Sequence, residues 1–410
     1  MKRAVVASCL AVLLLVLGIL PLAGISRGEA AKGEKQKAEN PKSEQAKKGT
    51  WQPELRIGLL SGQSSVTFHV SVPSVLEASD TQKRIVFFSP GKTMKITVQN
   101  GQLAVDGKRV PDGKIQLRPQ QKRPLTEMQI VINGKTYAGG AEVQLRGGKL
   151  TVSNLVAVED YLRGVLPAEM PYDWPEEALK AQAVAARTYA MKHRGKHEED
   201  GYDLCASTHC QVYDGIASDK PKTNAAIRAT HGEALTYKGK LIEAFFHTDS
   251  GGMTESCLEV WGTNMPYLVA ADEVQKGTMP WEVSYSLADF SSKLAKSGHG
   301  VGTVKQVKLS KLHVGKGASD RSPSGRVRQL RVTGSKGTKT ITGNELRSLL
   351  GLKSTLFDVH VAGGKVTISG YGWGHGIGLS QWGAKAFAAK LPYDKILAHY
   401  YKGTVLKKLY

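Results

Sequence analysis

A glutamate in apolar surroundings is the first candidate for chemistry in this sequence. Glu169 lies in the segment Pro167-Ala-Glu-Met-Pro171. Burial disfavours the charged form of a carboxyl group and raises its pKa, as a general acid working near neutral pH requires. Because two prolines four residues apart oppose a regular helix, we expect a shaped loop around Glu169. A surface or helix-capping glutamate is the simpler alternative.

Three soft metal ligands lie within six residues of one another: Cys205, His209 and Cys210. Tetrahedral Zn²⁺ takes thiolate and imidazole ligands of this kind. We therefore expect a zinc site in this loop, with His197, eight residues before Cys205, as the candidate fourth ligand. The alternative is a disulfide between Cys205 and Cys210, which would leave Cys257 as a free thiol.

A glycine-rich segment near the C-terminus combines polar and aromatic side chains. In Tyr371-Gly-Trp-Gly-His-Gly-Ile-Gly-Leu-Ser-Gln-Trp-Gly383, glycines at alternate positions let the backbone approach a ligand closely. His375 and Gln381 are suited to bind hydroxyl groups, and Trp373 and Trp382 to stack on sugar faces. A glycine-rich turn that opens a helix near Leu379 is the alternative.

A further histidine lies at the end of a predicted hairpin strand. The strand spans residues 241–246, and His247 leads from it into the loop Thr248-Asp-Ser-Gly-Gly252. A histidine in that position can orient a polar ligand. The simpler reading is a histidine whose hydrogen bonds are satisfied at the strand end.

The elements that must position these residues change in type along the chain. Short apolar alternations broken by Gly, Pro, Asn and Asp predict strands over 51–125. Helices are expected over 175–191, 221–230 and 344–350, the first opened by Pro175 and the last capped by Thr342. Since strands and helices do not alternate regularly, we predict an α+β fold, with a β-rich N-terminal unit followed by a mixed α/β catalytic core containing a substrate cleft.

The N-terminus and the charge limit the classes of partner. Lys2-Arg3 precede an uncharged run from Ala4 to Ser26, which is typical of an export signal. Its length is close to the roughly 20 residues of a spanning helix, so we expect an uncleaved anchor in the cytoplasmic membrane with the bulk of the chain outside. Cleavage near 28–31 and secretion to the cell wall is the alternative. The net charge of +20 favours a polyanion, and export excludes nucleic acid as that partner.

The chain of 410 residues is long enough for several units. We expect an anchor over 1–26, a disordered charged linker over 27–50, a small β-rich domain over 51–125 and a catalytic domain over 126–410.

Five segments, taken in this order, resemble the stage II sporulation protein D family of cell-wall lytic transglycosylases. They are Glu159-Asp-Tyr-Leu-Arg-Gly-Val-Leu-Pro-Ala-Glu-Met-Pro171, Ala178-Leu-Lys-Ala-Gln-Ala-Val-Ala-Ala-Arg-Thr-Tyr-Ala190, Thr208-His-Cys-Gln-Val-Tyr213, His247 to Gly252, and Gly374-His-Gly-Ile-Gly-Leu-Ser-Gln-Trp-Gly-Ala384. Together they are far more specific than any one alone, whereas residues 51–125 match weakly.

The resemblance implies a role for each motif. It implies Glu169 as the catalytic residue and a structural zinc ion on Cys205, His209 and Cys210. Its substrate cleft would contain Gln182, His247, Ser250, His375 and Gln381. The implied reaction cuts peptidoglycan glycan strands, preferably stripped of peptides, at the bond between N-acetylmuramic acid and N-acetylglucosamine, and leaves 1,6-anhydro ends. The implied setting is engulfment during sporulation, with a wall amidase as partner.

Two other functions fit the same residues. A non-enzymatic wall-binding module could activate an amidase. A zinc-dependent amidase could instead cut stem peptides, with His209 or His247 on a catalytic metal. The transglycosylase needs only one carboxyl group, unlike ordinary glycosidases, and no second acidic residue stands out in the motifs, although Asp249 is not excluded.

Overall fold

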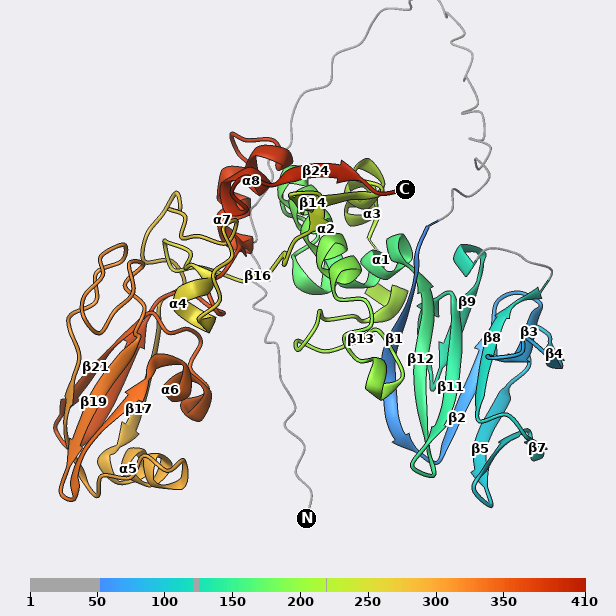
Figure 1. Ribbon diagram of the computed structural model, residues 1–410, viewed down its shortest axis with the longest axis horizontal. Coiled ribbons are helices and arrows are strands. Elements are labelled where there is room, and N and C mark those ends of the chain that lie inside the picture. The colour runs from blue at the N-terminus through green and yellow to red at the C-terminus, as the bar shows by residue number, and fades with distance from the viewer. Residues whose placement is uncertain (1–51, 121–124, 219) are drawn as a thin grey trace, which may run out of the picture. The chain divides into compact units, whose positions relative to one another are not determined.

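Figure 1 shows the computed structural model, which describes residues 52–120, 125–218 and 220–410. The expected anchor over 1–26 and linker over 27–50 lie outside the described residues. Within the described ranges, none of the helices combines the length and apolarity needed to cross a membrane. The described chain mixes helices and sheets, which agrees with the predicted α+β class.

Two antiparallel-rich sheets form the N-terminal part of the described chain (Figure 1). The seven-stranded sheet has the order β13-β1-β12-β11-β8-β3-β4, and the six-stranded sheet the order β10-β9-β2-β5-β6-β7. The strands of the first sheet are β1 (Glu54–Gln63), β3 (Ser74–Ala78), β4 (Arg84–Phe88), β8 (Lys114–Pro119), β11 (Gly140–Arg146), β12 (Lys149–Ala157) and β13 (Leu204–Cys205). Those of the second are β2 (Ser65–Val70), β5 (Met94–Gln99), β6 (Gln102–Val105), β7 (Lys108–Val110), β9 (Gln129–Ile132) and β10 (Lys135–Ala138).

The seven-stranded sheet runs across residue 125, where the sequence predicts a domain boundary. β1 pairs with β12 and β8 pairs with β11, so strands from both sides of that position share hydrogen bonds. Alternate side chains, among them Leu55, Ile57, Leu76 and Val152, are buried in one continuous hydrophobic core with the helices that follow. This alternation is what strands with one face on a core require.

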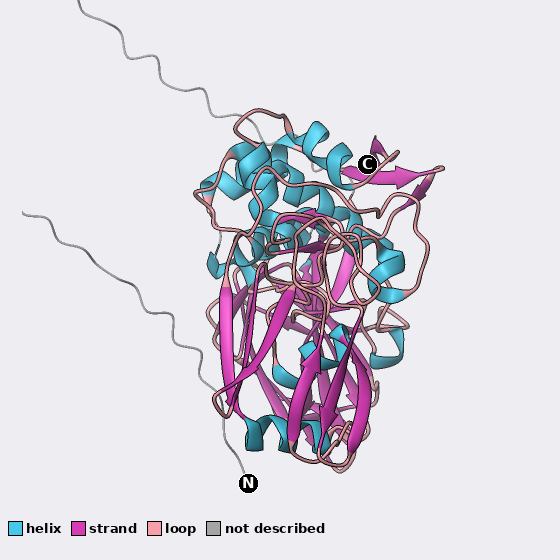
Figure 2. Cartoon of the chain, turned by 90° about the vertical axis from the view of Figure 1, so that its left-hand side faces the viewer, coloured by secondary structure: helices cyan, strands magenta, loops and turns pink. Residues whose placement is uncertain are grey.

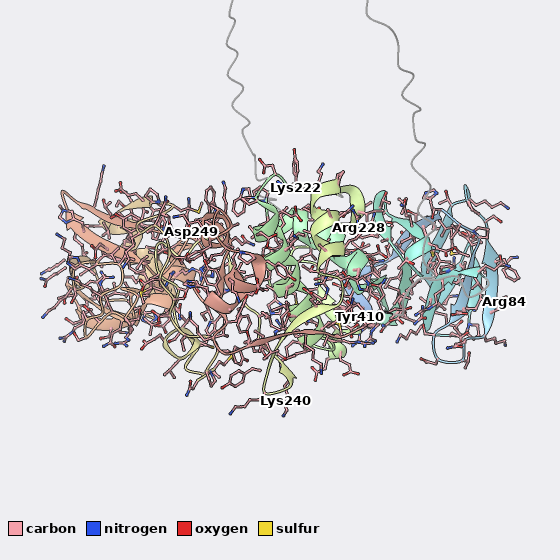
Figure 3. The ribbon with its side chains drawn as sticks, turned by 90° about the horizontal axis from the view of Figure 1, so that it is seen from above. Arg84, Lys222, Arg228, Lys240, Asp249 and Tyr410 are labelled. Atoms are coloured by element: carbon pink, nitrogen blue, oxygen red, sulfur yellow. The ribbon has the colours of Figure 1, made fainter. Side chains whose placement is uncertain are left out.

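Three helices follow the sheets: α1 (Val158–Glu169), α2 (Glu176–Lys192) and α3 (Pro221–Ala229). Figure 2 draws all helices in cyan and all strands in magenta, and a group of helices lies beyond one end of the long strands. α2 is alanine-rich and buries residues on all sides, because small side chains let neighbouring elements approach closely. A buried ion pair joins α1 to α2: Arg187 donates to both carboxylate oxygens of Glu159, at 2.8 and 2.6 Å. Tyr410, labelled in Figure 3, also donates to Glu159.

The chain then forms short elements around the glycine-rich segment. They are β14 (Glu233–Tyr237), β15 (Lys240–Leu241), β16 (Phe246–His247), α4 (Cys257–Trp261), β23 (Leu379–Ser380), α7 (Gln381–Phe387), α8 (Tyr393–Tyr400) and β24 (Val405–Lys408). β16 pairs in parallel with β23, which brings His247 beside Ser380. The two polar motifs, far apart in sequence, therefore lie on neighbouring strands.

Residues 281–370 form a second hydrophobic core, which the sequence did not separate from the catalytic domain. Its members include Phe290, Leu330, Leu346 and Phe357. Its elements are β17 (Trp281–Ser286), α5 (Leu287–Lys296), β18 (Val304–Lys308), β19 (Gln329–Gly334), β20 (Gly337–Thr342), α6 (Gly343–Leu350), β21 (Phe357–Ala362) and β22 (Lys365–Gly370). Thr342 caps α6 through a reciprocal capping box with Glu345, as its position before the helix predicts.

Basic side chains are spread over several elements of the surface. Figure 3 labels Arg84 on β4, Lys222 and Arg228 on α3, and Lys240 on β15, and all four are exposed. The positive charge is therefore not confined to one element, which suits attraction to an extended anionic surface.

Candidate active site

Glu169 is the last residue of α1, and not part of a loop as the sequence suggests. The helix continues through Pro167 for two further residues, so the proline falls within its last turn. Met170 is extended, with φ −131° and ψ 137°, as expected of a residue that precedes a proline. Pro171 thus ends the helix, and Pro167 does not.

Hydrogen bonds and burial fix the Glu169 carboxyl group. Its Oε1 accepts a hydrogen bond of 2.9 Å from the backbone N–H of Val212, and its side chain also interacts with Gln381. Burial raises the pKa of Glu169, and these two hydrogen bonds lower it in part. A raised pKa keeps a carboxyl group protonated closer to neutral pH, so Glu169 is suited to donate a proton.

The Glu169 carboxyl group lines a cleft of about 590 Å³. The cleft also contains three of the predicted substrate-binding residues: His247, His375 and Gln381. Within the described residues, Glu169 is the only carboxylate among those that line it. The structure therefore brings three of the predicted polar residues to a single acid.

Two histidines of the cleft, His247 and His375, are neutral near pH 7. Burial lowers the pKa of His375 to about 3, with further lowering by the charges of Arg347 and Arg326. Burial also holds the pKa of His247 well below its ordinary value. The carbonyl of Ile377 can only accept, so the Nδ1 of His247, 3.1 Å away, carries the proton. Its buried Nε2 has no partner within the described residues and is left as an acceptor.

Two glycines of the glycine-rich segment are required by close packing against β16. Gly374 has φ +116°, and a Cβ there would lie 2.6 Å from the Cβ of His247. Gly378 has φ +70°, and a Cβ there would lie 2.0 Å from the Phe245 carbonyl oxygen. Side chains at either position would push the segment away from His247.

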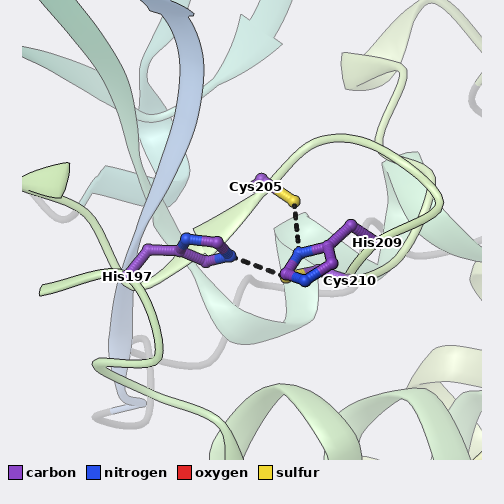
Figure 4. Close-up of side chains that lie close together, drawn as sticks. All are labelled: His197, Cys205, His209 and Cys210. Carbon is purple, nitrogen blue, oxygen red and sulfur yellow. Dashed lines mark hydrogen bonds between the residues drawn. The ribbon is translucent and has the colours of Figure 1, made fainter.

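The four predicted zinc ligands lie together (Figure 4). One ligand atom from each of His197, Cys205, His209 and Cys210 lies within 4.8 Å of the others. The Sγ of Cys210 is 3.4 Å from His197 Nε2, and the Sγ of Cys205 is 3.7 Å from His209 Nδ1. Ligands around a tetrahedral Zn²⁺ with normal bond lengths lie about 3.3 to 3.8 Å apart, so these distances fit that ion.

A carboxylate supports this ligand set from outside. The second ring nitrogen of His197, Nδ1, lies 3.0 Å from the Oδ2 of Asp200. Metal-binding histidines ordinarily donate their other N–H to such a group, which fixes the ring orientation. Cys205, Cys210 and Cys257 are all free thiols in the structure.

Two predicted substrate-binding residues do not line the cleft. Gln182 on α2 is completely buried, and neither polar atom of its amide has a hydrogen-bond partner in the described chain. A side chain without exposed surface does not contact a glycan directly, so this expectation is corrected. The hydroxyl of Ser250 instead donates to Glu273, 3.1 Å away.

Ser250 lines a second pocket, of about 280 Å³. That pocket also contains Asp249 and Glu273, and Asp249 is labelled in Figure 3. Burial raises the pKa of Glu273 to about 7, and the neighbouring Asp249 adds to the rise. The Oδ1 of Asp249 accepts from the Gly251 N–H and the Thr278 hydroxyl, at 2.7 and 2.8 Å. The carboxylates of this pocket are thus held apart from the Glu169 cleft.

The two predicted sugar-stacking tryptophans are likewise separated. Trp373 is 46% exposed and lines the Glu169 cleft, whereas Trp382 is 41% exposed and lines the second pocket. Trp382 packs edge-on against Trp174, with ring centroids 5.1 Å apart.

The sequence reasoning missed Trp261 and Arg347, which also line the Glu169 cleft. Trp261 ends α4 and packs on His375, with ring centroids 5.2 Å apart. Neither residue belongs to one of the sequence motifs described above. The only local indication was Trp261 itself, a tryptophan next to Gly262.

Comparison with known proteins places these motifs in context. Residues 146–237 match the family described as Stage II sporulation protein, and residues 263–378 match a domain of unknown function. The chain is 31% identical over 273 residues to stage II sporulation protein D of Bacillus amyloliquefaciens, covering 60% of this chain and 73% of the relative. It is 34% identical over 285 residues to an uncharacterized protein of Brachyspira hyodysenteriae, covering 68% and 74%. It is 32% identical over 365 residues to the amidase enhancer of Bacillus subtilis, covering 78% of this chain but 50% of that protein.

Proposed function

The chain belongs to the stage II sporulation protein D family, and we propose that it is a peptidoglycan lytic transglycosylase. Its substrate would be the bond between N-acetylmuramic acid and N-acetylglucosamine in glycan strands. The observation that carries this proposal is the single carboxyl group among the described residues of the cleft, Glu169, which is half-buried, held by two hydrogen bonds and raised in pKa. One acid that can give and then take a proton is what this reaction needs.

The reaction uses Glu169 twice. Its protonated carboxyl donates a proton to the bridging glycosidic oxygen as the bond to the muramic C1 breaks. The carboxylate then takes the proton from the muramic C6 hydroxyl as that oxygen forms a bond to C1. The products are a 1,6-anhydro end and a free hydroxyl on the leaving sugar, without consumption of water. The C6 hydroxyl is favoured as nucleophile because it belongs to the same sugar and is already positioned.

The neutral polar groups around Glu169 suit binding of an uncharged sugar ring. The Nε2 of His247 is a free acceptor for a sugar hydroxyl or amide N–H. Gln381 contacts the Glu169 carboxyl group and lies beside the same cleft. Because His247 and His375 are neutral near pH 7, neither of them competes with Glu169 as the acid.

We also propose that His197, Cys205, His209 and Cys210 hold a structural Zn²⁺. Four protein ligands would fill the coordination positions of a tetrahedral Zn²⁺ and leave none open for a catalytic water. This disfavours a zinc-dependent amidase on these residues. When bound, the ion would stabilise the loop that leads to Val212 and so hold the N–H that contacts Glu169.

The setting follows from the sequence and the relatives. Residues 1–26 would anchor the protein in the cytoplasmic membrane with the catalytic part outside, and the charge of +20 would draw it to the anionic wall. Sporulation is the process named by its relatives. A peptide-cleaving amidase is the expected partner. The relative named amidase enhancer also favours a second candidate function, non-enzymatic activation of such an amidase.

The test uses the purified protein and glycan strands stripped of peptides. Wild-type protein is expected to release 1,6-anhydro products, identified by mass spectrometry, and Glu169→Gln to release them about a thousandfold more slowly while still binding strands. Glu273→Gln is the matched control, because Glu273 is also half-buried and raised in pKa but lines the other pocket. Full activity of Glu169→Gln would refute the proposal. An inactive wild type that accelerates an added amidase would support the activator instead.

A further inference from the structure

Arg347 is a cationic residue that lines the Glu169 cleft and belongs to the part of the chain that forms the second core. It lies on α6, whose N-terminus is fixed by the capping box of Thr342 and Glu345 and whose Leu346 is fully buried in the second core. Leu346, the residue before Arg347, is thus fixed in the second core. The Arg347 side chain lines the cleft that contains Glu169. No motif of the proposed mechanism accounts for a guanidinium group at this place.

Polar contacts hold the second core against the cleft. Arg328 forms two hydrogen bonds of 2.6 Å with the carboxylate of Glu259, and Asn344 on α6 donates to the Val260 carbonyl at 3.0 Å. Glu259 and Val260 belong to α4, the helix that ends in the cleft residue Trp261. The position of α6 relative to the cleft is therefore fixed by several independent bonds.

The Arg347 guanidinium makes few polar contacts with the described residues. In the described part of the chain no carboxylate pairs with it, and its hydrogen bond to the protein runs from Nε to the Leu352 carbonyl, at 3.3 Å. That bond leaves the two Nη nitrogens for a ligand. Partial burial lowers the pKa of Arg347, but guanidinium groups remain charged at neutral pH. A partly desolvated cation without a partner is costly unless a ligand supplies the negative charge.

Lys196 is the other cation of the cleft, but it is already engaged. Its ammonium group lies 3.4 Å from the Tyr189 hydroxyl and 3.5 Å from the His209 carbonyl oxygen. Glu169 is the only negative group among the described lining residues, and it is neutral while it acts as an acid. The cleft therefore has an excess of positive charge, with Arg347 as its free donor.

The chemistry of the strand identifies the matching anion. N-acetylglucosamine is uncharged. N-acetylmuramic acid carries a 3-O-lactyl group, which is a neutral amide while the stem peptide is attached. Hydrolysis of that amide by an amidase leaves a free lactyl carboxylate on the sugar that contains the reacting C1. A planar carboxylate is the group that the two Nη atoms of an arginine bind most specifically.

We propose that Arg347 binds the lactyl carboxylate of a muramic residue from which the stem peptide has been removed, and thereby selects stripped strands over peptide-bearing ones. This inference rests on the proposed function. It makes Arg347 a specificity-determining residue and explains why the second core contributes to the cleft. It also orders the two reactions, because the amidase must act before the glycan is cut.

The experiment compares three substrates with the full-length protein. The first is stripped strands with free lactyl carboxylates, the second is the same strands converted to methylamides, and the third is peptide-bearing strands. Wild-type protein is expected to prefer the first over the second by about ten- to a hundredfold in kcat/KM, because a hydrogen bond to a charged group contributes a free energy of that size. Arg347→Gln should lower the rate on the first to that on the second and leave the second unchanged.

Matched variants separate this role from loss of structure. Arg331→Gln removes a charge from an exposed position on β19 of the same core and should keep the full preference. Arg347→Lys keeps the charge but loses the paired donors, so its preference should be intermediate. An equal fall of kcat/KM on both stripped substrates in Arg347→Gln would overturn the inference. A fall of kcat/KM confined to peptide-bearing strands would also overturn it, because it would indicate that Arg347 binds stem-peptide carboxylates.

Binding distinguishes failure of this inference from failure of the proposed reaction. In the Glu169→Gln background, the dissociation constant for stripped strands should be about ten- to a hundredfold lower than for methylamide strands, and Arg347→Gln should remove that difference. This measurement does not depend on cleavage. Equal affinity of the Glu169→Gln protein for both substrates would overturn the role of Arg347 even if the wild type cuts strands.

Discussion

The backbone N–H of Val212 donates a hydrogen bond of 2.9 Å to the Oε1 of Glu169. Val212 follows Cys210 by two residues, so the chain that carries two thiols and an imidazole also positions the acid. Thr208, His209 and Cys210 line the same cleft. The proposed metal site and the proposed catalytic group are thus connected through one short segment of backbone.

Removal of the metal is therefore expected to reduce catalysis although the metal takes no part in the reaction. Chelation should lower the rate on stripped strands at least about tenfold and lower the Tm, because the loop that holds Val212 loses its support. Added Zn²⁺ should restore both. Metal analysis before and after chelation, together with product release, provides the measurement.

Cysteine variants give the matched comparison for the metal. Cys205→Ser should remove the bound zinc and reproduce the effect of chelation. Cys257→Ala should retain one zinc per protein, because Cys257 is buried in the hydrophobic core away from the four ligands. A metal-free protein with an unchanged Tm and full activity would contradict this prediction.

The rate should fall as the pH rises. Glu169 must be protonated to act as the acid, and burial raises its pKa above the ordinary 4.5. The fraction of protonated acid, and with it kcat/KM, therefore declines as the pH passes upward through that raised pKa. Burial lowers the pKa of His375 to about 3 and holds the pKa of His247 well below its ordinary value, so neither histidine limits the rate near neutral pH. A pH profile of kcat/KM on stripped strands measures the decline.

Glu273 is the group that could be mistaken for Glu169 in such a profile. Its pKa is raised to about 7, but it lines the second pocket and contacts Ser250 and Tyr400. Glu273→Gln should therefore keep the decline at high pH. If the decline disappeared in that variant, or if the rate rose with pH through this range, the assignment of the acid to Glu169 would be wrong.

Trp373 should contribute more to strand binding than Trp382. The two side chains have similar exposure, 46% and 41%, and each has a lysine ammonium group over its ring, Lys353 at 4.8 Å and Lys385 at 4.6 Å. Only Trp373 lines the Glu169 cleft. In the Glu169→Gln background, Trp373→Ala should weaken binding of stripped strands about tenfold, through loss of apolar contact area.

Trp382→Ala serves as the control and should change the dissociation constant by less than about twofold. Its ring packs on Trp174 and not in the cleft. Titration calorimetry with strands of one defined length measures both variants. Equal weakening by the two substitutions would mean that the glycan extends across both pockets.

Local patterns predicted the elements that depend on neighbouring residues. The alanine-rich helix α2 spans Glu176–Lys192, close to the expected 175–191, and α6 begins after the cap at Thr342. The hairpin turn after β14 has Lys238 and Gly239 at positive φ, 48° and 76°. A cap, a turn and a run of good helix formers each act within a few residues. The local sequence is therefore sufficient to predict these elements.

Rules about single residues failed where packing outweighed them. Pro167 was expected to prevent a helix, but it lies in the last turn of α1, most of whose residues are buried. Gln182 was expected in the cleft, but α2 is buried on nearly all sides. The separate core of residues 281–370 was not predicted, because the sequence pattern of an apolar strand or helix is the same whichever core the element packs in.

The sequence by itself determined which side chains are available for chemistry: an acid between prolines, a cluster of thiols and imidazoles, and a glycine-rich segment with polar groups. Only the tertiary structure decided which of them share a cleft. His247 and Ser250 are three residues apart, yet they line different pockets, because β16 pairs with β23 and the chain then turns toward Glu273. Arg347 lines the same cleft as Glu169, although its helix α6 packs in the second hydrophobic core. Contacts between distant segments depend on how whole elements pack, and no local pattern records that.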